Sequence, residues 1–137
     1  MSATAIIVHD LEHAVAALSA AASLGAEVTL ASPPGAAAYL GAAVFRDMIA
    51  RAAAAHPGVE MRAVLDCGDN PGLALGALRQ GIKWVRIDAS EEVRARLGNI
   101  AAQLGAALDE GGPGDLDLLG AEDPLETCRA WLAGGKI

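Results

Sequence analysis

Acidic side chains follow several of the short apolar runs in this chain, and their type and position could support chemistry. Asp10, Asp66 and Asp88 each come at or just after such a run, and Asp69 lies in the same turn as Asp66. Clustered carboxylates can hold Mg²⁺ together with water, or act as an acid–base pair when burial separates their pKa values. They can equally shape turns, because Asx side chains bond to nearby backbone N–H groups. The sequence leaves both roles open.

The turn at 66–70, Asp-Cys-Gly-Asp-Asn, is the richest of these positions. It separates an apolar run from a helical pattern, and ligands in parallel α/β sheets sit at such turns. Cys67 could be a nucleophile at a helix start, although the neighbouring Asp66 and Asp69 disfavour a thiolate. The sequence predicts a polar, acidic ligand-binding rim at the carboxyl ends of the strands. Its predicted members are His9, Asp10, Ser32, Asp66, Cys67, Asp69, Asn70 and Asp88.

Apolar runs and helical patterns alternate five times along the chain. The apolar runs 5–8, 27–31, 59–65, 82–87 and 116–119 predict strands. Helices are predicted from residue 10 to 25, from 36 to 55, from 70 to 81, from 90 to about 110, and from 123 onward. Asp10, Asn70 and Ser90 are expected caps of three of these helices, and Pro71 suits a first helical position. Residue 123 begins a capping-box-like spacing.

Five βα units with short connections predict a single α/β domain over 1–137. We expect a three-layer sandwich with a five-stranded parallel sheet in the flavodoxin-like order 2-1-3-4-5. That order makes the first and third strands neighbours, so the Cα atoms of His9 and Asp66 should lie within roughly 10 Å. A relative of the (βα)-barrel is an alternative, but the chain holds too few units to close a barrel alone.

The strand–helix alternation, with Asp66 at the end of the third strand, resembles a response-regulator receiver domain. The resemblance implies that Asp66 would accept a phosphoryl group. The other positions depart from the receiver pattern, since an acidic pair after the first strand is replaced by His9-Asp10. The Ser or Thr that ends the fourth strand is replaced by Asp88, and the Lys that ends the fifth strand is missing at 119–121. Without that Lys, phosphoryl transfer loses its charge partner.

Charge and composition exclude several classes of protein. The 137 residues carry a formal net charge of −7, which disfavours binding to nucleic acid and to anionic membranes. No apolar run reaches the roughly 20 residues of a membrane helix, and residues 1–4 lack the start of a secretory signal. Cys67 and Cys128 are expected as reduced thiols in a cytoplasmic protein. The spacing of His and Cys predicts no metal site.

Cofactor signatures are weak in this sequence, so the cofactor stays unknown. The first turn lacks the glycine fingerprint of a dinucleotide site, and no aromatic residue lies near it to suit a flavin. The turn at 32–35 could offer N–H groups to an anion at a helix start.

The long helical segment 36–55 carries more apolar side chains than one stripe requires. Tyr39, Phe45 and Met48 lie among them and spread over more than one face. This surplus indicates either deep burial or a contact between proteins, and we expect a two-fold homodimer through this segment.

Taken together, the sequence predicts a small cytoplasmic ligand-binding or regulatory domain that self-associates. One alternative is a small enzyme that uses Asp66 or Cys67 with His9, assisted by Mg²⁺. A second alternative is a protein-interaction module with no small-molecule site.

Overall fold

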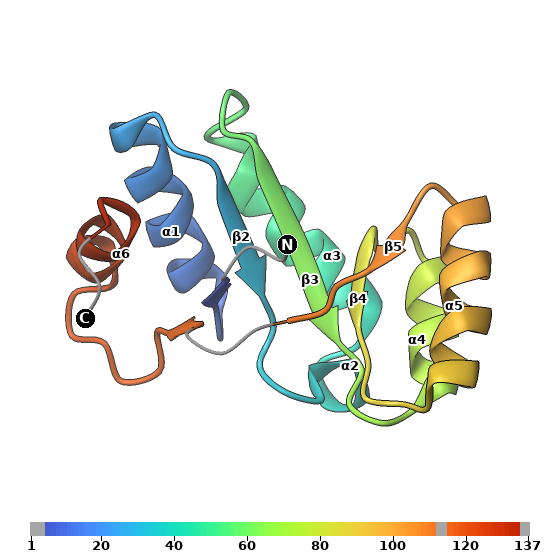
Figure 1. Ribbon diagram of the computed structural model, residues 1–137. Helices are drawn as coiled ribbons and strands as arrows, with labels where there is room; N and C mark the ends of the chain where they lie inside the picture. The colour runs from blue at the N-terminus through green and yellow to red at the C-terminus, as the bar shows by residue number, and fades with distance from the viewer. Residues whose placement is uncertain (1–4, 112–114, 135–137) are drawn as a thin grey trace.

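A six-stranded parallel sheet forms the centre of the computed structural model, which describes residues 5–111 and 115–134. The strands are β1 (Ile6–Ile7), β2 (Val28–Ala31), β3 (Met61–Asp66), β4 (Trp84–Arg86), β5 (Ala107–Leu108) and β6 (Leu116–Asp117). The helices are α1 (Leu11–Leu24), α2 (Ala36–Tyr39), α3 (Ala42–Ala54), α4 (Pro71–Arg79), α5 (Glu91–Gln103) and α6 (Pro124–Leu132). Figure 1 shows these elements, with the α1–α6 pair on the side of β1 and β2 and the α4–α5 pair on the side of β4 and β5.

The order of the strands is β5-β4-β3-β2-β1-β6, so the predicted order 2-1-3-4-5 is wrong. The first five strands follow one another across the sheet, as strands do in a (β/α) barrel. Strand β2 therefore lies between β1 and β3 and pairs with both. The predicted adjacency of His9 and Asp66 fails for this reason. Five βα units are compatible with either order, and the choice depends on long-range pairing that a local pattern does not contain.

The helices lie on one face of the sheet, so the predicted three-layer arrangement is also wrong. They pack side by side in the order α6, α1, α3, α4, α5, as expected when every right-handed crossover moves in the same direction. The main core lies between these helices and the sheet. Its larger fully buried members are Ile6, Leu18, Leu30, Phe45, Leu65 and Val85.

The second face of the sheet carries a smaller apolar cluster and a charged side chain. Ala5, Ala31 and Val64 are buried there, with Trp84 packed against them. Because side chains alternate along a strand, Arg86 projects from this same face while Val85 joins the main core. Both faces of the strands are thus partly covered, which explains why the short strands are almost continuously apolar.

Two glycines change the predicted lengths of helices. Gly41 has φ 89 and separates α2 from α3, where one helix over 36–55 was predicted. Gly105 has φ 71 and follows the end of α5, so Leu108 lies in β5 beside Val85 and not in a helix. These left-handed conformations favour glycine and interrupt a helix. Within 5–111 and 115–134, no helix combines the length and apolar character needed to cross a bilayer.

The expected helix caps are confirmed. Asp10 accepts from the N–H of His13, Asn70 from Leu73, Ser90 from Val93, and Asp123 from Glu126. Each cap satisfies an N–H group that the first helical turn leaves free. Because these helices begin after the carboxyl ends of strands, their caps form part of one edge of the molecule.

Candidate functional site

The candidate site is the edge where the strands end and the turns lead into helices, called the carboxyl-end rim below. The turns after β1, β2, β3, β4 and β6 form this rim, together with the residues that follow β5. Barrel-type proteins place their chemistry at this end of the sheet. Some residues on the rim have their polar atoms hydrogen-bonded within the protein, and others are accessible to a ligand.

His9 and Asp117 form the closest side-chain pair on the rim. Strand β6 lies beside β1, with Ile7 opposite Asp117, and His9 follows β1 by two residues. The His9 Nε2 atom donates to Asp117 Oδ1 at 2.6 Å. The backbone N–H of His9 donates to His13 Nδ1 at 3.1 Å, and the two rings meet edge to face. The His9 ring is therefore held by a carboxylate on one side and an imidazole on the other.

The carboxylate of Asp117 is stabilised in its charged form. Burial acts to raise the pKa of Asp117, but the Leu119 N–H and the His9 ring outweigh burial and lower that pKa. Leu119 donates to Asp117 Oδ1 at 2.9 Å. Since a carboxylate can only accept, it selects the His9 tautomer with a proton on Nε2. The Nδ1 atom of His9 is then the basic nitrogen, and the side chain is 23% exposed.

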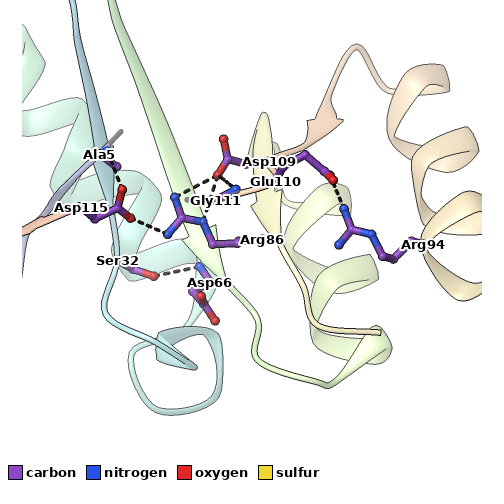
Figure 2. A network of polar contacts seen from close by, with 9 residues as sticks. All are labelled: Ala5, Ser32, Asp66, Arg86, Arg94, Asp109, Glu110, Gly111 and Asp115. Carbon is purple, nitrogen blue, oxygen red and sulfur yellow. Dashed lines mark hydrogen bonds and ion pairs between the residues drawn. The ribbon is translucent and has the colours of Figure 1, made fainter. Parts of the chain in front are cut away.

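Asp66 has a structural role in joining two turns. Its Oδ1 atom accepts from the N–H of Gly35 at 2.9 Å and from the N–H of Gly68 at 2.8 Å. The N–H of Asp66 donates to Ser32 Oγ at 2.9 Å, and that hydroxyl donates to the Pro33 carbonyl. Figure 2 shows Ser32 and Asp66 side by side at the ends of their strands. The structure thus brings two predicted site residues together, with their polar atoms engaged by the backbone.

Cys67 is unsuited to act as a nucleophile. Its side chain is buried, with 2% exposure, and burial followed by the charge of Asp66 raises its pKa to about 12. A thiol with so high a pKa carries almost no thiolate at neutral pH. Burial likewise raises the pKa of Cys128 to about 11. Both cysteines are unlinked.

The remaining predicted site residues lie on the rim but on separate turns. Asp10 and Asn70 cap helices through their side-chain oxygens. Asp69 and Asp88 are exposed, and the backbone N–H of Asp88 donates to the Gly68 carbonyl at 2.8 Å. The turns after β3 and β4 are thereby tied together, with two carboxylates facing solvent.

Arg86 anchors a network that the sequence analysis missed. Its Nε atom donates to Asp109 Oδ2 at 3.0 Å, and its Nη1 atom donates to Asp115 Oδ2 at 3.0 Å. The second oxygen of Asp115 accepts from the N–H of Ala5 at 2.8 Å. Figure 2 shows this guanidinium between the two carboxylates. The network ties β4 to the segment after β5 and to the start of β1.

Burial and the neighbouring carboxylates have opposite effects on the pKa of Arg86. Burial acts to lower the pKa of Arg86, but the two carboxylates reverse that effect and raise the pKa. The Nη2 atom lies 2.9 Å from Asp109 Oδ2, yet it forms no hydrogen bond of good geometry with any described residue. Arg86 is a charged residue in a strand whose other face, through Val85, lies in the core. A charged residue inside such an apolar run is the signal that could have revealed this network.

Carboxylates, imidazoles and thiols are the side chains that hold metal ions in proteins. Within residues 5–111 and 115–134, no three or more of these groups lie close enough to hold one ion.

The fold and rim define a class, that of (β/α)-barrel-type sheets with a functional edge at the carboxyl ends of the strands. Residues 1–103 match the sequence model of the family described as fructose-bisphosphate aldolase class-II. The chain belongs to this family. No curated protein matches the chain.

A solved structure supports the fold. A protein of Coccidioides immitis, proposed to be a fructose-1,6-bisphosphate aldolase, superposes with a TM-score of 0.65 and 23% sequence identity. The match covers 78% of this chain and 44% of the other, so the chain spans less than half the length of that relative.

Membership of an enzyme family overturns the leading prediction of a small regulatory or ligand-binding domain. Enzymes of this kind need residues that can transfer a proton. His9 is a predicted site residue whose imidazole can do so. Its partner Asp117 was not predicted as a site residue.

Proposed function

We propose that this chain carries out aldolase-type chemistry, making or breaking a carbon–carbon bond beside a carbonyl group. Membership of the class-II fructose-bisphosphate aldolase family supports the type of reaction. The hydrogen bond between His9 Nε2 and Asp117 Oδ1 carries the proposal for this chain. It leaves one imidazole nitrogen to act as a base at the carboxyl ends of β1 and β6.

An aldol cleavage needs one proton to move. The Nδ1 atom of His9 accepts the proton of the hydroxyl group that lies β to the carbonyl. The C–O bond of the new aldehyde gains double-bond character while the carbon–carbon bond breaks. Its electron pair passes to the α-carbon and the carbonyl oxygen as an enolate. The imidazolium of His9 then returns the proton to the α-carbon, and condensation follows the same steps in reverse.

Asp117 positions His9 and stabilises the imidazolium that forms during proton transfer. A carboxylate in this position holds the tautomer that leaves Nδ1 unprotonated. Because it acts through His9, Asp117 is a positioning residue. Its replacement should affect the rate of proton transfer more than the binding of substrate.

The test is an aldol assay with the full chain and three variants. Fructose 1,6-bisphosphate serves as the cleavage substrate, and dihydroxyacetone with glyceraldehyde serves for condensation. We expect His9→Gln to lower kcat at least about 100-fold, since general acid–base catalysis contributes that much or more. Asp117→Asn should lower kcat with KM changed much less.

His56→Gln is the matched control, because His56 also bonds a single side chain, Ser19, but precedes β3 at the opposite edge. The control should keep wild-type activity. Equal activity in the His9 and His56 variants, or no turnover by the wild-type chain with either probe, would overturn the proposal.

Self-association through 36–55 and a cytoplasmic location are also part of the proposal. The exposed Tyr39 and Val44 support a contact at that segment. The buried, unlinked Cys67 and Cys128 suit a reducing compartment.

A further inference from the structure

A cavity at the starts of β3 and β4 lies against α3, at the edge of the sheet opposite the carboxyl-end rim. It has a volume of about 250 Å³ and is lined in part by Trp84, so we call it the Trp84 cavity. We propose that the Trp84 cavity binds a small carboxylate with an apolar body. This site shares no residue with the His9–Asp117 pair and does not depend on the proposed aldolase-type function.

The floor of the Trp84 cavity is apolar. Phe45 and Ile49 of α3 and Ile82, which precedes β4, line it and are 0%, 6% and 5% exposed. Burying apolar surface on such a floor is favourable. A cavity of about 150 Å³ is enough to hold benzene, so the Trp84 cavity has room for a larger apolar group. The ligand that suits this floor has an apolar body of one or two rings, or a short alkyl chain.

The polar part of the lining is cationic. Arg46, Arg62 and Lys83 line the Trp84 cavity, and no carboxylate side chain of residues 5–111 and 115–134 joins them. Ligand pockets are commonly apolar with a few polar groups that fix the orientation of the ligand. Here those groups carry positive charge, so the head group that they favour is an anion.

Two of these cations have no acidic partner within the chain, although the chain carries 17 acidic and 10 basic residues. Arg86, Arg94 and Arg96 each pair with a carboxylate. Arg62 and Lys83 form no ion pair with any acid of the described residues. An anion from outside the chain would therefore pair with cations without breaking an existing ion pair.

Two of the three cations are also held in position. The Nη1 atom of Arg46 donates to the Gln80 carbonyl at 2.8 Å, and its Nε atom pairs with the exposed Asp47. The Arg62 guanidinium lies 4.0 Å from the centre of the Trp84 ring. A guanidinium that stacks on a ring keeps its N–H donors in its own plane, where a carboxylate can accept two of them. Side chains that are already ordered lower the entropic cost of binding.

The neighbouring acids belong to a different cavity. Glu60 directly precedes β3, and together with Glu27 and His56 it lines a cavity beside the end of α1. The two cavities thus have opposite charge at the same edge of the sheet. Only the Trp84 cavity combines cations with a buried apolar floor, and this combination selects an anion with an apolar body over inorganic phosphate.

The experiment measures binding to the full chain by isothermal titration calorimetry with three probes. 2-Naphthoate has the proposed chemistry, 2-naphthamide has the same shape without the charge, and inorganic phosphate has the charge without the apolar body. We expect 2-naphthoate to bind at least about tenfold more tightly than either, because hydrogen bonds to a charged group are the stronger ones. Equal affinity for 2-naphthamide or for phosphate, or no binding of 2-naphthoate at millimolar concentration, would overturn the proposal.

The two tryptophans report where the probe binds. Trp84 lines the cavity, whereas Trp131 lies in α6 at the other side of the sheet. In a nitrogen–proton correlation spectrum, 2-naphthoate should shift the indole N–H signal of Trp84 and leave that of Trp131 in place. A shift of the Trp131 signal alone would contradict the assignment of the site.

Charge-removing variants test the role of the cations. The double variant Arg62→Gln with Lys83→Gln should weaken 2-naphthoate at least about tenfold. Arg51→Gln with Arg79→Gln is the matched control, since both arginines are exposed in the last turns of α3 and α4 and do not line the cavity. The control and His9→Gln should keep wild-type affinity. Equal weakening in both double variants, or loss of binding in His9→Gln, would overturn the proposal.

Discussion

Asp117 accepts a hydrogen bond from His9 at 2.6 Å, although 108 positions separate the two residues in the chain. The pair exists because β6, the last strand, lies beside β1, the first. The pairing of these strands places an imidazole and a carboxylate at the carboxyl ends of neighbouring strands.

Asp117 should contribute stability that depends on pH. Its pKa in the folded chain is lowered from the ordinary value of 3.8. A depressed carboxyl pKa adds stability that is complete above the unfolded value and is lost as pH falls below 3.8 through the folded pKa. Asp117→Asn should therefore be less stable than wild type at about pH 6, and the difference should shrink by about pH 2.5.

Urea unfolding of both proteins at the two pH values measures this effect. Because the Asp117 side chain is 49% exposed, solvent screening keeps the difference small. A difference that stays constant with pH would show that the carboxylate charge does not stabilise the fold.

Arg86→Met should destabilise the chain strongly. The variant leaves Asp109 and Asp115, which are 3% and 10% exposed as side chains, without their cation. Removing one partner of a buried ion pair costs about 3–5 kcal/mol. Arg96→Met is the matched control, because the exposed pair of Arg96 with Glu92 should be worth less than about 1 kcal/mol.

The free energy of unfolding in urea distinguishes the two arginines. Adding Asp115→Asn to Arg86→Met should restore part of the lost stability, since one unpaired charge is removed. Equal midpoints for the Arg86 and Arg96 variants would refute the structural role of the network.

Much of the local structure could be predicted from the sequence, because local rules determine it. The apolar runs placed β1 to β4 and β6, and Asp10, Asn70 and Ser90 were identified as helix caps. Strand β5 was missed because its two residues continue the apolar periodicity of α5, and only Gly105 separates them. The strand order was missed because it depends on pairing between distant segments.

The candidate site was predictable only in part for the same reason. His9 and Asp66 could be assigned to strand ends, but their partners depend on the strand order. With β2 beside β3, Asp66 bonds the N–H of Gly35, and with β6 beside β1, His9 bonds Asp117. No local pattern in the sequence connects these positions.

The thiols should react slowly in the native state. Burial raises the pKa of Cys67 to about 12 and that of Cys128 to about 11. Alkylation by iodoacetamide at about pH 8 should modify neither residue until denaturant is added, after which both should react. Rapid modification of Cys67 in the folded chain would contradict its burial and reopen a nucleophilic role.

Tyr39 and Phe45 should respond differently to a charged substitution. Tyr39 is 69% exposed, whereas Phe45 is fully buried in the core, so of these two residues only Tyr39 is accessible to the proposed dimer contact. Tyr39→Glu should weaken the proposed self-association without unfolding the chain. Phe45→Glu should unfold it, because a buried charge without a partner is very costly.

Sedimentation at several concentrations, combined with circular dichroism, separates these effects. A wild-type chain that stays monomeric at high concentration would contradict the proposed dimer.

The most direct test of the proposed chemistry is exchange of the α-protons of dihydroxyacetone in D₂O, followed by NMR. Formation and reprotonation of an enolate by His9 should replace these protons with deuterium in the presence of the wild-type chain. The His56→Gln variant should exchange them at the wild-type rate, and His9→Gln should fall close to the rate in buffer alone. Exchange by His9→Gln at the wild-type rate, or none above buffer by the wild-type chain, would contradict the central role of the His9–Asp117 pair.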